Sequence, residues 1–283
     1  MGRAQRIDGI VSPIQKTVEK AIPGISNRMS ENTCVRATVE HRVATIALDR
    51  PPLNVMNIAM MRQIHEAIVS LTDRCDILVF RGSGEKGFSA GAEIADHTPD
   101  RVGDMLDAFH AIFRELWRSP LITVAAVHGH CLGGGCELAT FCDFVLASES
   151  ATFSQPEIKL GCFPPVAMIT FPRLVGMRAA LDLILTGRSI SANEAYCLGL
   201  VTRIVPDGEL DAALAALIGD LRSLSSHVLA MVRRKLRTSN RFDFEGSLES
   251  MEDLYLHGLM KTHDAAEGIR AFMEKRQPVW QGK

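Results

Sequence analysis

Two glutamates stand in settings where an acidic side chain is unusual, and each could do acid–base chemistry. Glu137 follows three consecutive glycines inside the apolar stretch GHCLGGGCELATFCD (residues 129–143). Glu157 lies in the loop-like stretch SQPEIKLG (residues 154–161). An ionised carboxylate is rarely buried without a partner, so both positions call for a functional or structural reason. Two carboxylates on different elements could face one pocket as a general acid and a general base.

The three glycines, residues 133–135, suggest a second kind of chemistry because they precede a predicted helix. The first turn of a helix has free N–H groups and the positive end of the helix dipole. A glycine there lets a substrate oxygen approach the backbone closely. Small residues around Gly91 in FSAGAEI (88–94) could present the N–H of Ala92 in the same way. Two converging N–H donors form an oxyanion hole. A tight packing turn would explain one or two of the glycines, but not the glutamate that follows.

Hydrophobic periodicity indicates which elements must position these groups. Alternation of apolar and polar residues predicts strands, and apolar residues at helical spacing predict helices. The predicted strands are a pair over 38–49 and single buried strands over 76–80 and 121–127, and the predicted helices are 58–71 and one capped by Thr98 that runs to Leu116. Strands alternate with helices until about residue 205, which predicts an α/β layered core.

The pattern changes beyond residue 205, where successive helices are predicted over 209–224, 227–238 and 244–262. Asp264 and Glu267 have capping-box spacing for one more helix. Ser191 and Glu194 give the same signal for a helix that ends near Gly199. The predicted organisation is an N-terminal extension over 1–34, an α/β core over 35–205 and a helical C-terminal region over 206–283.

Composition excludes several classes of protein. The formal net charge of the 283 residues is -2, which gives no global reason to expect nucleic acid or an anionic membrane as a partner. No apolar run approaches the ~18 residues of a membrane span. Seven cysteines without a CxxC pair predict buried free thiols and a reducing compartment, the cytoplasm. The first thirty residues mix basic and acidic side chains, so an arm is favoured over a mitochondrial presequence.

Three further motifs receive a simple interpretation. GSGEKG (82–87) matches GxGxxG, but the residues after it are poor helix formers, which favours a surface loop over dinucleotide binding. His128 and His130 have no further metal ligand at a recognisable spacing. The basic run RRKLR (233–237) has no interleaved aromatic residues, which favours a solvated helix face over an RNA site.

The segments that carry the glutamates and the small-residue turns resemble a known family. FSAGAEI, HGHCLGGGCELATFCD and FSQPEIKLGCFP are similar, in this order, to the signature blocks of the crotonase, or enoyl-CoA hydratase/isomerase, superfamily. LTGRSISANEAYCLGLVTRIVP and AEGIRAFMEKRQPVW continue the pattern, so the resemblance covers about residues 35–280. It implies a spiral core of ββα units, a helical C-terminal trimerisation region and acyl-CoA substrates. It also implies a homotrimer or a dimer of trimers, with no metal and no cofactor beyond the coenzyme A of the substrate.

The resemblance also implies roles for individual residues. Ala92 and Gly134 match the two backbone donors that bind the thioester oxygen, and Glu137 and Glu157 match the catalytic glutamates of the hydratases. The positions that match coenzyme A contacts are Pro52, Leu53, Ala90, Ala92, Ile94 and Gly133, with Phe272 and Lys275 near the C-terminus, where the contact sometimes crosses a subunit boundary.

One segment departs from the usual hydratase pattern. Where relatives commonly continue with a glycine-rich run, this chain has CFPPVAM (162–168). We expect Pro164 and Pro165 to stiffen this turn, and Val166 and Met168 to enlarge the apolar surface of the acyl pocket. Together with EIADH (93–97), the segment is similar to the cyclohexa-1,5-diene-1-carbonyl-CoA hydratases of anaerobic aromatic degradation.

The resemblance therefore predicts a hydratase, a carbon–oxygen lyase that acts on an enoyl-CoA or a cyclic dienoyl-CoA. Double-bond isomerases and hydrolases of the same superfamily are the enzymatic alternatives. A non-catalytic, RNA-binding relative is the alternative of another class. Such a relative would be expected to lose an active-site glutamate or to gain a lysine-rich helix, whereas the predicted helix over 58–71 contains no lysine.

Overall fold

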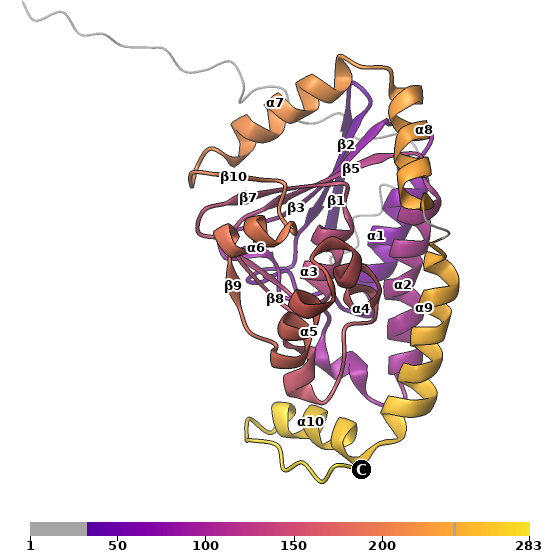
Figure 1. The fold of residues 1–283 in the computed structure, drawn as a ribbon, viewed down its shortest axis with the longest axis vertical. Helices are drawn as coiled ribbons and strands as arrows, with labels where there is room; N and C mark the ends of the chain where they lie inside the picture. Colours follow the sequence, from indigo (N-terminus) through magenta and orange to yellow (C-terminus); the bar gives the residue numbers. More distant parts are fainter. Residues whose placement is uncertain (1–32, 240–241) are drawn as a thin grey trace, which may run out of the picture. The chain divides into compact units, whose positions relative to one another are not determined.

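The computed structural model of the protein describes residues 33–239 and 242–283, whose strands form two sheets (Figure 1). The larger sheet has the order β1-β2-β3-β5-β7-β10, and its strands are parallel except for the β1–β2 pair. They are β1 (Val35–Glu40), β2 (Val43–Leu48), β3 (Ile77–Gly82), β5 (Ile122–Val127), β7 (Phe144–Ser148) and β10 (Arg203–Val205). The predicted extension over 1–34 lies outside the described residues except for its last two.

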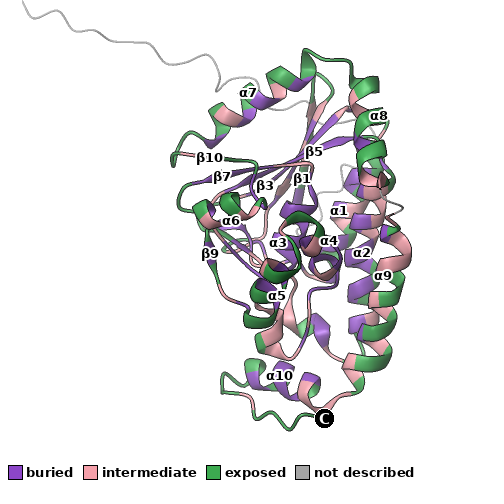
Figure 2. Cartoon of the chain, in the orientation of Figure 1, coloured by how far each residue is buried: buried purple, intermediate pink, exposed green. Residues whose placement is uncertain are grey.

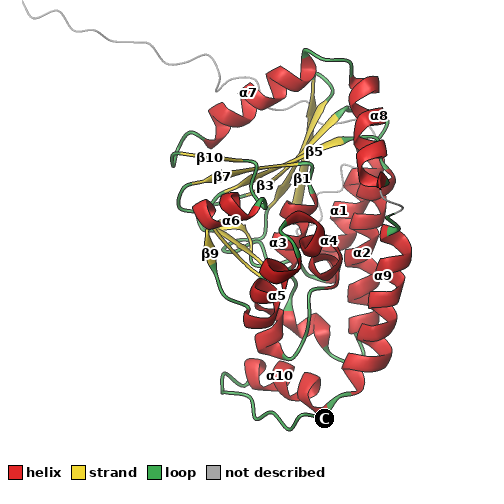
Figure 3. Cartoon of the chain, in the orientation of Figure 1, coloured by secondary structure: helices red, strands yellow, loops and turns green. Residues whose placement is uncertain are grey.

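The smaller sheet has the order β4-β6-β8-β9. Its strands are β4 (Gly87–Ser89), β6 (His130–Leu132), β8 (Thr152–Ser154) and β9 (Ile190–Ser191), of which the first three are parallel. Strands of the two sheets alternate along the chain, so each of β3, β5 and β7 is followed by a strand of the smaller sheet and then by a helix. Figure 3 shows the strands in yellow and the helices in red. This arrangement confirms the predicted α/β class and the spiral of ββα units.

Helices surround the two sheets in the described part of the chain (Figure 1). The α-helices are α1 (Ile58–Leu71), α2 (Val102–Arg118), α3 (Gly134–Phe141), α4 (Pro165–Leu174), α5 (Met177–Thr186), α6 (Ala192–Leu198), α7 (Leu210–Arg222), α8 (Ser226–Arg237), α9 (Phe244–Asp253) and α10 (His263–Met273). Shorter turns are the 3-10 helices η2 (Ile94–His97), η3 (Pro156–Leu160) and η6 (Leu259–Lys261) and the π-helix η5 (Leu254–Gly258). None of the described helices is long and apolar enough to cross a membrane.

The burial pattern explains why these segments adopt their structures. All six residues of β5 are buried, as expected for a central parallel strand covered on both faces, and in Figure 2 this strand is purple. In β2, buried and half-buried residues alternate, as predicted for 38–49. Helix α1 has the predicted bounds, and the side chain of Asn57 caps its first turn by accepting from the N–H of Met60 at 2.9 Å.

Two of the predicted helix starts are wrong. Helix α2 begins at Val102 rather than after a Thr98 cap, because 94–97 form η2 and the Thr98 hydroxyl donates to the Ala95 carbonyl oxygen. Helix α10 is capped by Thr262, whose hydroxyl accepts from the N–H of Ala265, so Asp264 and Glu267 do not form a capping box. The predicted Ser191 cap and Gly199 end of α6 are confirmed.

Other expectations hold only in part. The helix predicted over 244–262 is divided into α9, η5 and η6. All seven cysteines are free thiols, as predicted, but Cys34 is half-buried and Cys197 is exposed.

The basic run on α8 is a solvated face only in part: Arg234, Lys235 and Leu236 are exposed, as predicted, but Arg233 is buried and Arg237 is half-buried. Arg233 is 7% exposed, and its Nε donates to a carboxylate oxygen of Asp143 at 2.7 Å. Its Nη atoms donate to the carbonyl oxygens of Leu116 and Ser119. Arg237 donates to the second oxygen of Asp143, so one carboxylate joins two turns of α8 to the core.

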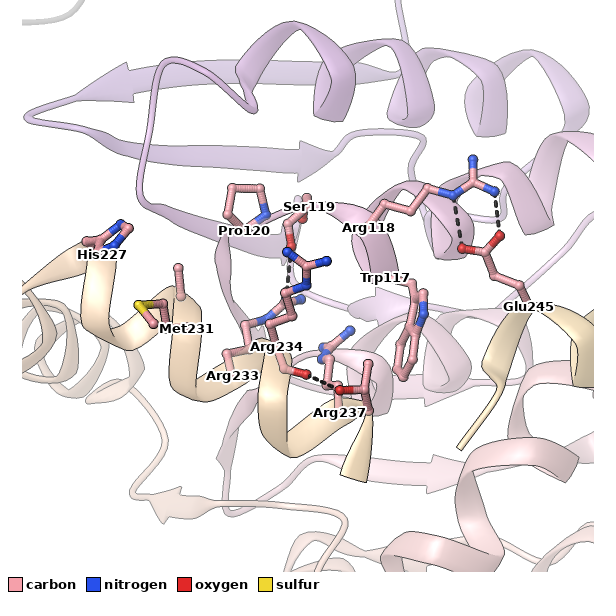
Figure 4. A pocket seen from close by; sticks show the side chains of 12 residues that line it. Trp117, Arg118, Ser119, Pro120, His227, Met231, Arg233, Arg234, Arg237 and Glu245 are labelled. Atoms are coloured by element: carbon pink, nitrogen blue, oxygen red, sulfur yellow. Dashed lines mark hydrogen bonds and ion pairs between the residues drawn. The ribbon is translucent and has the colours of Figure 1, made fainter. Parts of the chain in front are cut away.

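Figure 4 shows these arginines beside Trp117 and the Arg118–Glu245 ion pair, in a surface pocket of about 540 Å³. Burial alone would raise the pKa of Asp143, but the guanidinium groups of Arg237 and Arg233 hold this pKa below its usual range. Arg233 and Arg237 therefore fasten α8 to the end of α2 and to the segment after α3.

Replacing one residue of the cluster formed by Asp143, Arg233 and Arg237 should destabilise the fold. In Arg233→Met, Asp143 and two carbonyl oxygens lose a buried donor, so we expect the free energy of unfolding to fall by about 3 kcal/mol. Denaturant unfolding measures the change. The control Arg234→Met removes an exposed guanidinium that makes no ion pair with the described residues and should cost less than about 0.5 kcal/mol. Equal effects of the two substitutions would contradict this role.

Candidate active site

The candidate site lies where three neighbouring strands of the smaller sheet end. Because β4, β6 and β8 are parallel neighbours, their carboxyl ends lie on the same edge of the sheet. The turn after β4 holds Ala92, the turn after β6 holds Gly134 at the start of α3, and the turn after β8 holds Glu157 in η3. Three segments spread over about 65 residues of sequence thus meet at one place.

The turns after β4 and β6 bring two backbone amides together. A Cβ atom built on Gly91, where φ is 89°, would lie 2.9 Å from the amide nitrogen of Gly134. A Cβ built on Gly134 would lie 3.5 Å from the amide nitrogen of Ala92. Neither of these two N–H groups has a hydrogen-bond partner among the residues that the structure describes. Two adjacent, unpaired backbone donors are the geometry of an oxyanion hole.

Each glycine of the run 133–135 has its own reason to lack a side chain. At Gly133 φ is 51°, and a Cβ would lie 2.5 Å from Oε1 of Glu157. A Cβ on Gly134 would meet the ring of Phe109 at 2.8 Å, and one on Gly135 would meet Ser89 of β4 at 2.7 Å. The run therefore makes room for a carboxylate, exposes an amide and seats α3 against the smaller sheet.

The two glutamates are held by different elements. Glu137 lies in the first turn of α3 and is 3% exposed. Its Oε1 accepts from the N–H of Ala167, in the first turn of α4, at 2.9 Å. Glu157 is half-buried, and its carboxylate lies against Gly133. The helix start inside CFPPVAM thus stabilises the negative charge of Glu137.

Burial raises the pKa of both acids. The pKa of Glu137 rises to about 7, because desolvation outweighs the hydrogen bonds that its ionised form accepts from the amides of Ala167 and Val166. The pKa of Glu157 lies well above its usual value, first because of desolvation and then because of the negative charge of Glu137. An acid pair with raised pKa values can keep one proton near neutral pH, as acid–base chemistry requires.

A small cavity joins the amides and the acids. It measures about 30 Å³, which is room for one or two waters. Ala92, Gly134, Glu137 and Glu157 all line it. The remaining wall is largely apolar and consists of Met105, Leu106, Phe109, Phe163, Pro164 and Pro165 with His97 and Tyr255. The structure thus brings together the four residues that the sequence singled out for chemistry.

The CFPPVAM segment contributes to this wall differently from our expectation. Phe163, Pro164 and Pro165 line the cavity. Val166 is fully buried in the hydrophobic core, and Met168 packs against that core, so neither is among the residues that line the cavity. The difference arises because α4 begins at Pro165 and turns the next side chains inward.

The positions predicted to contact coenzyme A fall into two groups. Leu53 and Ala90 are hydrogen-bonded to each other beside the turn that holds Ala92, and Pro52 and Ile94 lie in the flanking segments. The second group, Phe272 and Lys275, is exposed at the end of α10 and does not line the cavity. Contact of either group with coenzyme A stays a prediction.

Sequence reasoning missed two polar residues at the cavity. His97 ends η2 and is 9% exposed, and Tyr255 lies in the π-helix η5 with its ring 4.9 Å from that of Phe163. A π-helix often marks a functional site, but its presence could not be read from the periodicity of 244–262. His97 lies in the EIADH segment noted above, where nothing in the sequence indicated that it would line the cavity.

Neither His128 nor His130 takes part in a metal-binding cluster. His128 pairs with the carbonyl oxygen of Gly84, and His130 pairs with the hydroxyl of Thr152. Within 33–239 and 242–283, no group of three or more His, Cys, Asp or Glu side chains is placed to hold a metal ion.

Comparison with known proteins identifies the family. A family model described as enoyl-CoA hydratase/isomerase matches residues 38–283. The chain belongs to the enoyl-CoA hydratase/isomerase family. It is 35% identical over 239 residues to the cyclohexa-1,5-dienecarbonyl-CoA hydratase of Thauera aromatica. This alignment covers 84% of this chain and 92% of that protein.

Two further members of the enoyl-CoA hydratase/isomerase family illustrate the range of similarity. The chain is 32% identical over 246 residues to the crotonyl-CoA hydratase of Syntrophomonas wolfei, covering 84% of this chain and 94% of that protein. The crystal structure of an enoyl-CoA hydratase from Mycobacterium avium subsp. paratuberculosis superposes with a TM-score of 0.79 at 26% identity. That alignment covers 88% of this chain and 99% of the other, so the fold is shared over nearly its whole length.

The raised pKa values predict how stability depends on pH. Because the folded pKa of Glu137 is about 7 against an ordinary 4.5, the folded state binds a proton that the unfolded chain has released between these values. This contribution to stability is present below pH 4.5 and is lost as the pH rises through about 7. In Glu137→Gln, which keeps an oxygen for Ala167, the loss should be smaller.

Thermal unfolding at about pH 5 and about pH 8 measures the effect. The melting temperature of Glu137→Gln relative to that of the unsubstituted chain should increase with pH. Exposed Glu149→Gln is the control and should show no such trend. Parallel curves for Glu137→Gln and the unsubstituted chain would contradict the buried-acid account.

Proposed function

We propose that this chain adds water to the carbon–carbon double bond of an enoyl-CoA or cyclic dienoyl-CoA thioester. One observation carries the proposal: the unpaired N–H groups of Ala92 and Gly134 open on the same small cavity as Glu137 and Glu157. The names of the relatives, all acyl-CoA hydratases, support the same reaction. Hydration is redox-neutral and the two amides stabilise the enolate oxygen, so the proposal includes no metal and no redox cofactor. The coenzyme A belongs to the substrate.

The two amides act on the thioester carbonyl oxygen. When water adds at the β carbon, negative charge gathers on that oxygen as an enolate forms. Fixed N–H groups of Ala92 and Gly134 stabilise this charge without reorganising, and each such donor contributes about 3 kcal/mol. The absence of side chains at Gly91 and Gly134 is what lets the oxygen reach both donors.

The pKa values divide the acid and base roles between the glutamates. Amides at the start of α4 stabilise the ionised form of Glu137, which suits it to take a proton from the attacking water. Burial and the charge of Glu137 keep the proton on Glu157, which suits it to protonate the α carbon. The protons balance, because the reaction consumes one at the α carbon and releases one from water.

The cavity of about 30 Å³ must widen to admit an acyl group, and the nature of its walls favours a flat, apolar one. Phe109, Phe163, Pro164 and Pro165 supply these apolar walls. A cyclic dienoyl group, such as cyclohexa-1,5-diene-1-carbonyl, meets this description and is the substrate of the Thauera relative by its name. A role in aromatic degradation follows if this substrate is correct. We propose that the coenzyme A moiety runs past Pro52, Leu53, Ala90, Ile94 and Gly133, with Phe272 and Lys275 completing its site from the same or a partner subunit.

Isomerisation and hydrolysis are the alternatives within the family. Retention of both acids favours hydration, because a double-bond shift needs only one group to move the proton. Incubation with linear and cyclic enoyl-CoA and dienoyl-CoA thioesters, followed by mass spectrometry, separates these reactions. Products heavier by one water support hydration. An unchanged mass with a new isomer would replace hydration by isomerisation. Release of free coenzyme A would replace it by hydrolysis.

We further propose a homotrimer or a dimer of trimers that works in the cytoplasm. Support for assembly comes from four apolar side chains of α8 that are at least half exposed, namely Val228, Met231, Val232 and Leu236. Seven free thiols support a reducing compartment, with the mitochondrial matrix as the alternative. Sedimentation equilibrium tests the assembly, and a monomer would refute it.

The RNA-binding alternative is disfavoured because both acids are in place, and a gel shift at physiological salt tests it.

Removing either carboxylic acid should abolish most turnover without abolishing binding. In Glu137→Gln and Glu157→Gln we expect kcat to fall by about 10²–10⁴-fold, because each variant loses one proton-transfer group. Binding of a saturated acyl-CoA should persist, since the amides of Ala92 and Gly134 remain. Steady-state kinetics and calorimetry measure the two quantities. Exposed Glu149→Gln is the matched control. Full activity in either active-site variant would remove that residue from its role.

A further inference from the structure

A buried glutamine lies against the carboxylate of Glu157. Gln155 directly precedes η3 and is 1% exposed. One end of its side-chain amide lies 3.2 Å from Oε2 of Glu157 and 3.3 Å from the carbonyl oxygen of Gly133. Both of these oxygens accept hydrogen bonds, so the hydrogen-bond network assigns the nitrogen of Gln155 to this end. With its two N–H bonds, Gln155 therefore donates to both.

The same amide joins the turn after β8 to the turn after β6. The N–H of Gly133 donates to the carbonyl oxygen of Ser154 at 2.9 Å, and the carbonyl oxygen of Gly133 accepts from Gln155. Gln155 thus holds the carboxylate of Glu157 at a fixed distance from the peptide that precedes the amide of Gly134.

The ionisable neighbours of Glu157 do not replace this donor. Glu137 raises the pKa of Glu157, and the side chains of Cys162 and Tyr255 are paired with each other. The backbone N–H of Glu157 is the other group that favours its ionised form. Within the described chain, Gln155 is therefore the side chain that donates to this carboxylate.

Proton transfer from Glu157 strengthens the hydrogen bond from Gln155. While Glu157 is protonated, the amide of Gln155 occupies Oε2 and leaves Oε1 to carry the proton. When that proton passes to the α carbon of the substrate, the electron pair of the broken O–H bond stays on the carboxylate. Hydrogen bonds to an ionised acceptor are the stronger ones, so the bond offsets part of the desolvation cost of the new charge.

We propose that Gln155 is a positioning residue for Glu157, whose side-chain N–H holds Oε2, directs the transferable proton to Oε1 and stabilises the carboxylate that proton transfer leaves. The catalytic part of this inference rests on the function proposed above. The hydrogen bond itself belongs to the folded chain and can be tested without a substrate.

Infrared titration of Glu157 tests the hydrogen bond. The C=O band of its protonated carboxyl group is identified by its loss in Glu157→Gln and is then followed with pH in the unsubstituted chain and in Gln155→Met. Methionine is similar in size to glutamine but has no N–H to donate. Because the donor favours the ionised form, its loss should raise the pKa of Glu157, and the midpoint of the titration should move up by about one pH unit.

Steady-state kinetics separates positioning from packing. In Gln155→Met, kcat for hydration should fall about 10–100-fold, whereas binding of a saturated acyl-CoA should change by less than about twofold. In a Glu157→Gln background the same substitution should change kcat by less than about twofold, because the group through which Gln155 acts is already gone. Gln155→Leu should repeat these results with a second apolar side chain, and exposed Gln281→Met is the matched control that should show none of them.

An unchanged or lower pKa of Glu157 in Gln155→Met and Gln155→Leu would overturn the inference. An equal loss of kcat with and without the carboxylic acid of Glu157, or no loss in either, would also overturn it, because Gln155 would then not act through that acid. If the unsubstituted chain hydrates no enoyl-CoA, the proposed function fails, and the infrared titration still decides whether Gln155 donates to Glu157.

Discussion

The parallel pairing of β4, β6 and β8 is the interaction on which the site depends. Parallel neighbours end on the same edge of a sheet, so the turns that follow them meet although they are far apart in sequence. One turn supplies the amide of Ala92, the next supplies the amide of Gly134, and the third supplies Glu157. Each glycine at this edge removes a Cβ that would hold the turns apart. The sheet register and the glycines together create a site that none of the three segments could form alone.

Burial of two carboxylic acids is the energetic cost of this arrangement, and neighbouring helices offset it. The start of α4 donates an amide to Glu137. The C-terminal helix packs on η3, because Asp264 and Gly268 of α10 lie against the backbone of 160–161, next to Glu157. Glu267 of α10 binds Arg270 on the same helix, and it ties the last segment of the chain to this helix by binding Arg276 and accepting from the N–H of Val279. The position of one acid is thereby linked to the last residues of the chain.

Local signals in the sequence predicted most of what is local in the structure. Apolar periodicity defined α1 to the residue, and the Ser191 and Gly199 caps defined α6, because both depend on neighbours within one turn. The glycine run and two glutamates marked the site through their chemical type. The sequence could not show that Arg233 and Arg237 bind Asp143, which is about 90 residues away, nor that His97 lines the same cavity as the acids. Such contacts are set by tertiary packing, which no window of sequence contains.

The central claim is that the amides of Ala92 and Gly134 hold one substrate oxygen. Infrared difference spectroscopy of a bound acyl-CoA, labelled with ¹³C at the thioester carbonyl, reports on that oxygen directly. Two fixed N–H donors polarise the carbonyl more strongly than water does, so its stretching frequency should lie below the value in solution. A frequency equal to or above the solution value would show that the two amides do not act on the same oxygen, and the account of the site would fail.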